Sequence, residues 1–139
     1  FVAEQDAWLP EMAIKKAGDI LTANPDIDII WSANEGGTVG SVMAVKNAGK
    51  QGDVVVFGTD ASEQLVEFAL SDDGILQAIT TQTPFELGVK SVELAVAALR
   101  GQQVEAKVVM DGVLIAREDP EGVRAFGQRM KELIALGNK

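Results

Sequence analysis

The sequence contains no cysteine and no histidine among its 139 residues. Their absence excludes thiol nucleophiles, disulfides, histidine general bases and zinc sites built from these side chains. A lack of cysteine is compatible with any redox compartment, so it does not indicate where the protein resides. We expect no catalytic residue, no cofactor and no bound metal ion.

Basic residues and long apolar runs are also scarce. Twelve Lys and Arg residues stand against 21 Asp and Glu residues, which gives a net charge of −9. Such a surface repels phosphate backbones, so we expect no nucleic-acid partner. No apolar run approaches the roughly 18 residues of a membrane span. The first residues show no signal-peptide pattern, and the chain does not begin with Met, so we expect Phe1 to result from an internal cut or from processing.

What is present is the composition of a globular domain, with 47% hydrophobic and 24% charged residues. The hydrophobic pattern alternates between strands and helices. Strands are expected at 1–4 (a strand end), 27–33, 54–58, 75–81 and 107–116, and helices at 10–24, 38–49, 60–72, 83–101 and 119–137. This alternation predicts an α/β fold, a parallel sheet in three layers with helices on both faces.

Local signals mark several of these elements. Pro10 suits the first position of a helix, and residues 34–37 are expected to form a turn. Thr83 and Glu86 are spaced as a capping box around Pro84. Trp31 falls inside an apolar strand, which favours a place in the core.

Ligands of parallel α/β sheets bind beyond the carboxyl ends of the strands. Trp8, Asn34, Asp60 and Gln82 occupy four such ends. An aromatic ring covers the apolar face of a sugar ring. A carboxylate accepts hydrogen bonds, whereas an amide both donates and accepts, so this set suits adjacent hydroxyls. The four residues therefore predict a site for a neutral sugar.

Each of the four residues also has a plainer interpretation. Trp8 can be a hydrophobic staple, Asn34 a turn former, Asp60 a helix N-cap and Gln82 a loop residue. For a single Asp or Asn at a strand end, capping is the commoner role. Their joint position at one edge of the sheet is what favours the sugar site.

Two further motifs do not support a ligand. Residues 34–38 resemble a phosphate-binding turn but lack the spacing and the lysine of a P-loop. Asp72-Asp73-Gly74 lacks the other ligands of a calcium loop, so we expect a solvated turn there.

Three stretches, at 24–35, 55–60 and 78–84, resemble in order and spacing the periplasmic sugar-binding proteins of ABC transporters, the ribose-binding group of the type I fold. The likeness extends to about Val109. It implies a protein that captures a monosaccharide between two lobes and delivers it to a membrane permease, in the periplasm or as an extracytoplasmic lipoprotein. The resemblance implies no enzymatic activity.

The resemblance also assigns roles to single residues. Trp8 takes the place of the aromatic that stacks on the sugar, Asn34 and Asp60 those of the polar strand-end ligands, and Gln82 that of the polar residue before the crossover between lobes. Glu35 departs from the family, which often has Asp at this position.

The same resemblance divides the chain into three parts. Residues 1–83 would form most of the C-terminal lobe, 84–107 a hinge crossover and a helix of the N-terminal lobe, and 108–139 a return strand and C-terminal helix. The N-terminal lobe and one central strand of the second lobe would be missing. We therefore expect unpaired backbone and an open apolar face, and association with another copy or with the missing part of the protein.

Two rival functions remain open at this point. The effector-binding domain of a sugar-responsive transcriptional repressor shares the fold, and a helix-turn-helix upstream of Phe1 would favour it. An enzyme with a doubly wound fold would have to rely on Asp, Ser or Lys chemistry. The sequence does not identify the sugar.

Overall fold

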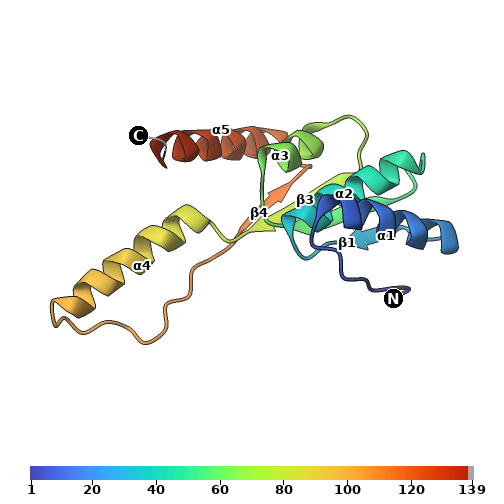
Figure 1. Cartoon of the computed structure of the whole chain (residues 1–139). Coiled ribbons are helices and arrows are strands. Elements are labelled where there is room, and N and C mark those ends of the chain that lie inside the picture. Colours follow the sequence, from blue (N-terminus) through green and yellow to red (C-terminus); the bar gives the residue numbers. More distant parts are fainter. Residues whose placement is uncertain (138–139) are drawn as a thin grey trace.

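A computed structural model describes residues 1–137 as an α/β fold (Figure 1). In chain order its elements are α1 (Pro10–Ala23), β1 (Ile29–Trp31), α2 (Glu35–Asn47), β2 (Val55–Thr59), α3 (Glu63–Leu70), β3 (Leu76–Thr81), α4 (Pro84–Leu99), β4 (Val113–Ala116) and α5 (Pro120–Gly137). The predicted alternation of strands and helices is confirmed from residue 10 onward.

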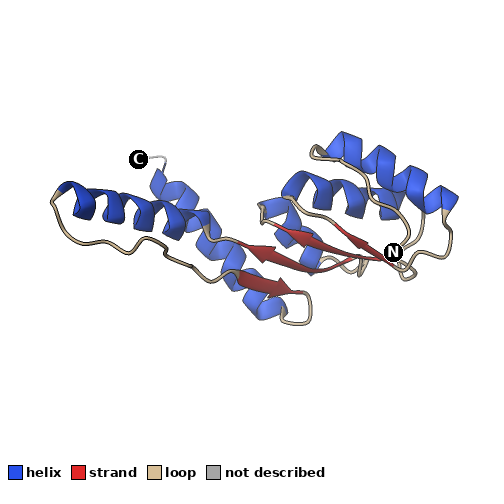
Figure 2. Ribbon diagram, turned by 90° about the horizontal axis from the view of Figure 1, so that it is seen from below, coloured by secondary structure: helices blue, strands red, loops and turns tan. Residues whose placement is uncertain are grey.

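The four strands form one sheet in the order β1-β2-β3-β4, seen from below in Figure 2. The first three strands are parallel, and β4 pairs with β3 in the antiparallel sense. The chain leaves β3 for α4 and returns through residues 102–112, so β4 runs back along β3. Only Val113–Ala116 of the strand expected at 107–116 pairs with the sheet.

The core lies between one face of the sheet and α2, α3 and α5. Val56, Ile79 and Ile115 point into it from three strands, and Val45 and Leu65 meet them from α2 and α3. Each of these side chains is at most 4% exposed. Burying one such side chain contributes about 2 kcal/mol to stability, so this face anchors the helices.

The opposite face of the sheet is open within residues 1–137. Ile29, Trp31, Phe57 and Leu114 share it, because Trp31 lies in register with Phe57 and side chains alternate along a strand. Their exposed fractions are 61%, 66%, 36% and 67%. The prediction that Trp31 lies in the core is therefore wrong, because no described helix covers this face.

The outer edge of β1 has no neighbouring strand among the described residues. Residues 1–4 were expected to end a strand, and they form none; Phe1 is fully exposed. A strand is held by hydrogen bonds to a neighbour, and no described segment offers one here. That prediction is therefore wrong.

Helix α1 packs closely on α2 through alanine and glycine. Ala13 and Ala17 are buried on the inner face of α1, and Gly40 faces Ala13 from α2. A Cβ atom on Gly40 would lie 2.3 Å from the Cβ of Ala13 and 2.6 Å from the carbonyl oxygen of Pro10. The two helices touch at this point, and their contact places the loop before α1 at the end of the sheet.

Helix α4 projects away from the sheet in both views (Figures 1 and 2), and none of its residues is buried. Its predicted capping box is absent. Thr83 adopts a left-handed conformation with φ 48°, and its side chain makes no capping hydrogen bond. An N-cap side chain reaches the helix from an extended backbone, which explains why the prediction is wrong.

Helix α5 begins as predicted, with Asp119 accepting a hydrogen bond from the Gly122 N–H at 2.9 Å. It packs on α3 and β4. Gly127 allows this approach, because a Cβ there would lie 2.9 Å from a methyl group of Val66. The role of residues 119–137, which the sequence left open, is therefore to close one end of the core.

Candidate functional site

Asn34 is the N-cap of α2. Its backbone is extended, and its Oδ1 atom accepts a hydrogen bond from the Gly37 N–H at 3.1 Å. The turn expected at 34–37 is therefore the first turn of α2, and the prediction of a separate turn is wrong. The other end of the carboxamide, Nδ2, donates to the carbonyl oxygen of Trp8 at 3.0 Å.

Asp60 follows β2 with a left-handed backbone of φ 70°, a conformation that Asp tolerates better than most residues. Its Oδ2 atom accepts a hydrogen bond from the Glu35 N–H at 3.2 Å. The positive end of the α2 dipole favours a carboxylate at this place. Asp60 does not cap α3, because Ser62 accepts from the Leu65 N–H instead.

Trp8 lies in the loop immediately before α1, with 66% of its surface exposed. Its carbonyl oxygen is held by Asn34, while its indole ring is left open to solvent. A hydrophobic staple packs its ring against the first turns of the helix that follows. Trp8 is too exposed to be packed against α1 as a hydrophobic staple. Its aromatic face is therefore open to a ligand.

Gln82 follows β3 and precedes Thr83. It lines a cavity of about 390 Å³ between α4 and the returning segment, where Leu87, Lys90 and Glu105 are among its neighbours. Within the described residues no hydrogen bond joins Gln82 to Trp8, Asn34 or Asp60. The Asp60 N–H donates to the carbonyl oxygen of Thr80 in the neighbouring strand β3 at 2.7 Å. Asp60 therefore lies beside Thr80, and Gln82 follows Thr80 by two residues.

The structure thus brings three of the four predicted residues together around the N-terminus of α2. Hydrogen bonds run from Trp8 through Asn34 to the first turn of α2, and from that turn to Asp60. Trp8 is exposed and Asn34 and Asp60 are half-buried, and within residues 1–137 none of the three has a lysine or arginine as a hydrogen-bond partner. The arrangement can stack on an apolar ring face and exchange hydrogen bonds with hydroxyl groups.

Sequence reasoning missed the residues that support this arrangement. Thr38 is fully buried, and its hydroxyl donates to the Asn34 carbonyl oxygen at 2.8 Å. A Cβ atom on Gly58 would lie 2.3 Å from that hydroxyl, so β2 needs a glycine at this position. The sequence signal is the Gly36-Gly37-Thr38 run two residues after Asn34, because these residues are small enough for close packing.

The Asp72-Asp73-Gly74 turn has a structural role. Burial by itself raises the pKa of the Asp73 carboxyl, but hydrogen bonds from Ser71 and the Ile75 N–H and the nearby Lys46 ammonium together hold that pKa below its usual value. The Asp73 side chain is 15% exposed. The expectation of a solvated turn is therefore wrong for Asp73.

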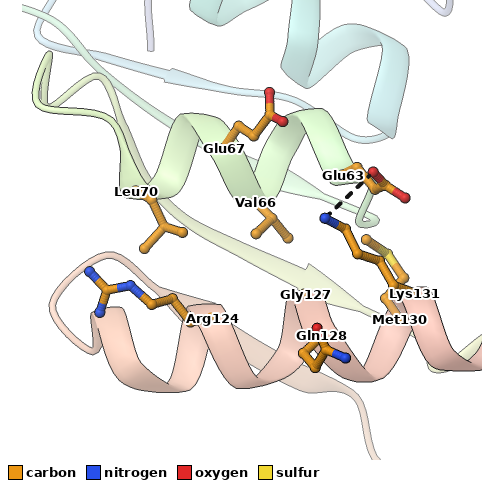
Figure 3. Close-up of a pocket in the computed structure, with 9 residues that line it drawn as sticks. All are labelled: Glu63, Val66, Glu67, Leu70, Arg124, Gly127, Gln128, Met130 and Lys131. Carbon is orange, nitrogen blue, oxygen red and sulfur yellow. Dashed lines mark ion pairs between the residues drawn. The ribbon is translucent and has the colours of Figure 1, made fainter.

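Other features of residues 1–137 offer no second site. No cluster of three or more His, Cys, Asp or Glu side chains is arranged to hold a metal ion there. None of the described helices is long and apolar enough to cross a membrane. A groove of about 220 Å³ between α3 and α5 is bridged by an ion pair of Lys131 and Glu63 at 3.9 Å (Figure 3). It contains none of the predicted site residues.

Comparisons with known proteins identify the family of the chain. A family model described as a periplasmic binding protein domain matches residues 1–103. The ribose import binding protein of Escherichia coli K12 is 36% identical over 100 residues, which cover 72% of this chain and 33% of that protein. The D-allose-binding periplasmic protein of the same organism is 35% identical over 104 residues, with 74% and 33% covered.

A solved structure shows the same fold. An ABC transporter periplasmic solute binding protein from Actinobacillus succinogenes, crystallised with D-allose, superposes with a TM-score of 0.81 at 32% identity. The match covers 87% of this chain and 43% of that one. The chain spans about a third of the length of the curated relatives that it matches. It carries part of the type I fold, and it belongs to the periplasmic binding protein domain family.

Proposed function

We propose that this chain supplies one wall of a monosaccharide site in the solute-binding component of an ABC importer. The observation that carries the proposal is the network around the N-terminus of α2. It brings an exposed indole, a carboxamide and a carboxylate to the carboxyl end of a parallel sheet, and no described cation is among their hydrogen-bond partners. The match to sugar-binding relatives over most of the chain supports it.

Each group would keep capacity for a sugar after its contacts within the protein. The Oδ1 atom of Asp60 has no hydrogen-bond partner among the described residues, so it can accept from two hydroxyls. Asn34 keeps a second N–H and a second lone pair. The ring of Trp8 would cover the apolar face of the sugar. Gln82 would contact the sugar from the side of the hinge.

A hinge after β3 is part of the same proposal. We propose that residues 1–83 form most of one lobe, that 84–107 cross to the other lobe, and that 108–139 return. Helix α4 supports this, since it buries none of its residues here and exposes Phe85, Val92 and Leu99. Closure about Gln82 and Thr83 would desolvate the sugar between the lobes.

The partner and the compartment follow from the same proposal. The closed, loaded protein would dock on the permease of its transporter, in the periplasm or as an extracytoplasmic lipoprotein. The relatives are named as import binding and periplasmic proteins, which favours transport over the effector domain of a repressor. We propose no catalytic role, since the site's groups are arranged to hold hydroxyls.

The open face of the sheet would be covered in the whole protein by chain outside residues 1–139. Ile29, Trp31 and Leu114 leave an apolar surface of a kind that soluble monomers rarely expose. We propose that the isolated chain covers the same face by packing it against a second copy.

The experiment is calorimetric titration of the intact protein with D-ribose, D-allose and a wider sugar panel. Trp8→Ala and Asp60→Ala should each weaken binding at least tenfold without unfolding the protein, and Trp8→Ala should leave the melting temperature nearly unchanged. Trp8→Phe, which keeps a ring, should lose less. Asp19→Ala, on the exposed side of α1, is the control and should bind normally. Full affinity in Trp8→Ala and Asp60→Ala would refute the site.

A further inference from the structure

The loop that carries Trp8 is anchored through its backbone and not through its ring. The carbonyl oxygen of Asp6 accepts a hydrogen bond from Lys16 Nζ at 2.5 Å, and that of Trp8 accepts from Asn34 Nδ2 at 3.0 Å. The indole meanwhile stays 66% exposed. Trp8 therefore takes its position from the residues that hold its carbonyl oxygen.

Gly36 makes the space for that carbonyl group. It is buried in the first turn of α2, and a Cβ atom there would lie 2.3 Å from the Trp8 carbonyl oxygen. Any other residue at position 36 would push the Trp8 backbone away from α2. Gly36 and Asn34 thus act on the same atom, one by leaving room and the other by donating a hydrogen bond.

Asn34 joins two segments that are 26 residues apart in the sequence. Ser or Asp would cap α2 about as well as Asn does. An ionised Asp side chain has no donor for the Trp8 carbonyl oxygen. A Ser side chain that caps α2 is too short for its hydroxyl to reach that oxygen as well. A carboxamide offers an acceptor and a donor at opposite ends of one small group. Capping alone therefore does not explain this residue.

We propose that Asn34 is a positioning residue for Trp8, which fixes the loop before α1 so that the indole faces the end of the sheet, with Gly36 as the residue that permits the contact. The inference deepens the proposed function. It rests on that function for the contact between Trp8 and a sugar, but not for the position of the loop. The position of the loop itself is measurable without any ligand.

The test compares reciprocal changes at two helix caps. Asn34→Ser keeps an N-cap on α2 but removes the donor to Trp8, and Ser62→Asn makes the opposite exchange on α3, where Ser62 only caps. Both are made with Trp31→Phe, which leaves Trp8 as the single tryptophan. The readouts are the fluorescence anisotropy of Trp8 and its quenching by acrylamide, with helix content from circular dichroism.

We expect Asn34→Ser to lower the anisotropy of Trp8 and raise its quenching, while helix content stays equal to that of Ser62→Asn. Gly36→Ala should change the anisotropy and the quenching of Trp8 in the same directions, because the new Cβ pushes the Trp8 carbonyl group away. This variant serves as the test if Asn34→Ser does not fold. Unchanged anisotropy and quenching in a folded Asn34→Ser or Gly36→Ala variant would overturn the inference.

Titration of the intact protein with D-ribose and D-allose separates this inference from the proposed function. A mobile Trp8 together with weaker sugar binding supports both. A mobile Trp8 with unchanged affinity supports the positioning role and refutes the sugar contact of Trp8. A fixed Trp8 with weakened affinity overturns the positioning role and leaves Asn34 as a direct ligand.

Discussion

Replacing Gly40 by alanine tests the close contact between α1 and α2. The new Cβ would lie 2.3 Å from the Ala13 Cβ, 2.6 Å from the Pro10 carbonyl oxygen and 2.9 Å from the Ile14 nitrogen. Carbon atoms in contact prefer about 3.5–4.0 Å. Two of the three neighbours are backbone atoms of α1, so no rotamer change relieves the clash, and α1 must move away from α2.

The expected cost follows from two opposing effects. Overpacking of a well-packed site costs about 1–3 kcal/mol, and the rigid backbone neighbours place Gly40→Ala at the upper end. Alanine in a helix interior returns up to about 1 kcal/mol relative to glycine. The net destabilisation should be about 2 kcal/mol, which lowers the melting temperature by roughly 6 °C in a domain of this size.

Gly18→Ala is the matched control, because it is the same substitution inside α1. A Cβ at Gly18 would have nothing within 4 Å, so this variant should be stabilised by up to about 1 kcal/mol. Urea denaturation followed by circular dichroism measures both. The packing argument is refuted if Gly40→Ala is as stable as Gly18→Ala.

Two further predictions concern the Asp73 turn and the open sheet face. The lowered pKa of Asp73 means that its ionised form stabilises the fold above the unfolded pKa of 3.8, and that this stability is lost as the pH falls through the folded pKa. Asp73→Asn should therefore be less stable than the parent chain at pH 7, and the difference should shrink below about pH 4 in urea titrations; a constant difference would contradict the assignment. For the open face, the isolated chain should sediment as a dimer or larger species, and Trp31→Lys should shift it toward monomer, whereas Lys15→Ala on α1 should not. A parent chain that sediments as a monomer would rule out the proposed pairing.

Features that depend on neighbouring residues were predicted well. Pro10, Pro84 and Asp119-Pro120 mark the starts of three helices, and all three begin there. The β-branched runs locate β1, β2 and β3 to within two residues at each end. The rule that parallel sheets bind ligands at their carboxyl ends selected Trp8, Asn34, Asp60 and Gln82, and the structure links the first three through α2. That these residues bind a sugar stays a prediction.

Features that depend on distant partners were not predictable in this way. Residues 1–4 have the composition of a strand but no described neighbour to pair with, and Trp31 has an apolar setting in sequence but an open face in space. Thr83 was expected to cap α4 through its side chain, but its left-handed backbone prevents this. The choice of Ser62 over Asp60 as the cap of α3 depends on the hydrogen bond that Asp60 makes to the start of α2.

The sequence by itself determined the α/β class and the starts of α1, α4 and α5, because propensity, capping and hydrophobic period act over a few positions. It also predicted a set of site residues, and only the tertiary structure decided which groups those residues contact. Asn34 reaches Trp8 across 26 positions, and Gly36 leaves room for a carbonyl group from another segment. Such contacts arise when packing brings distant segments together, so no local pattern records them.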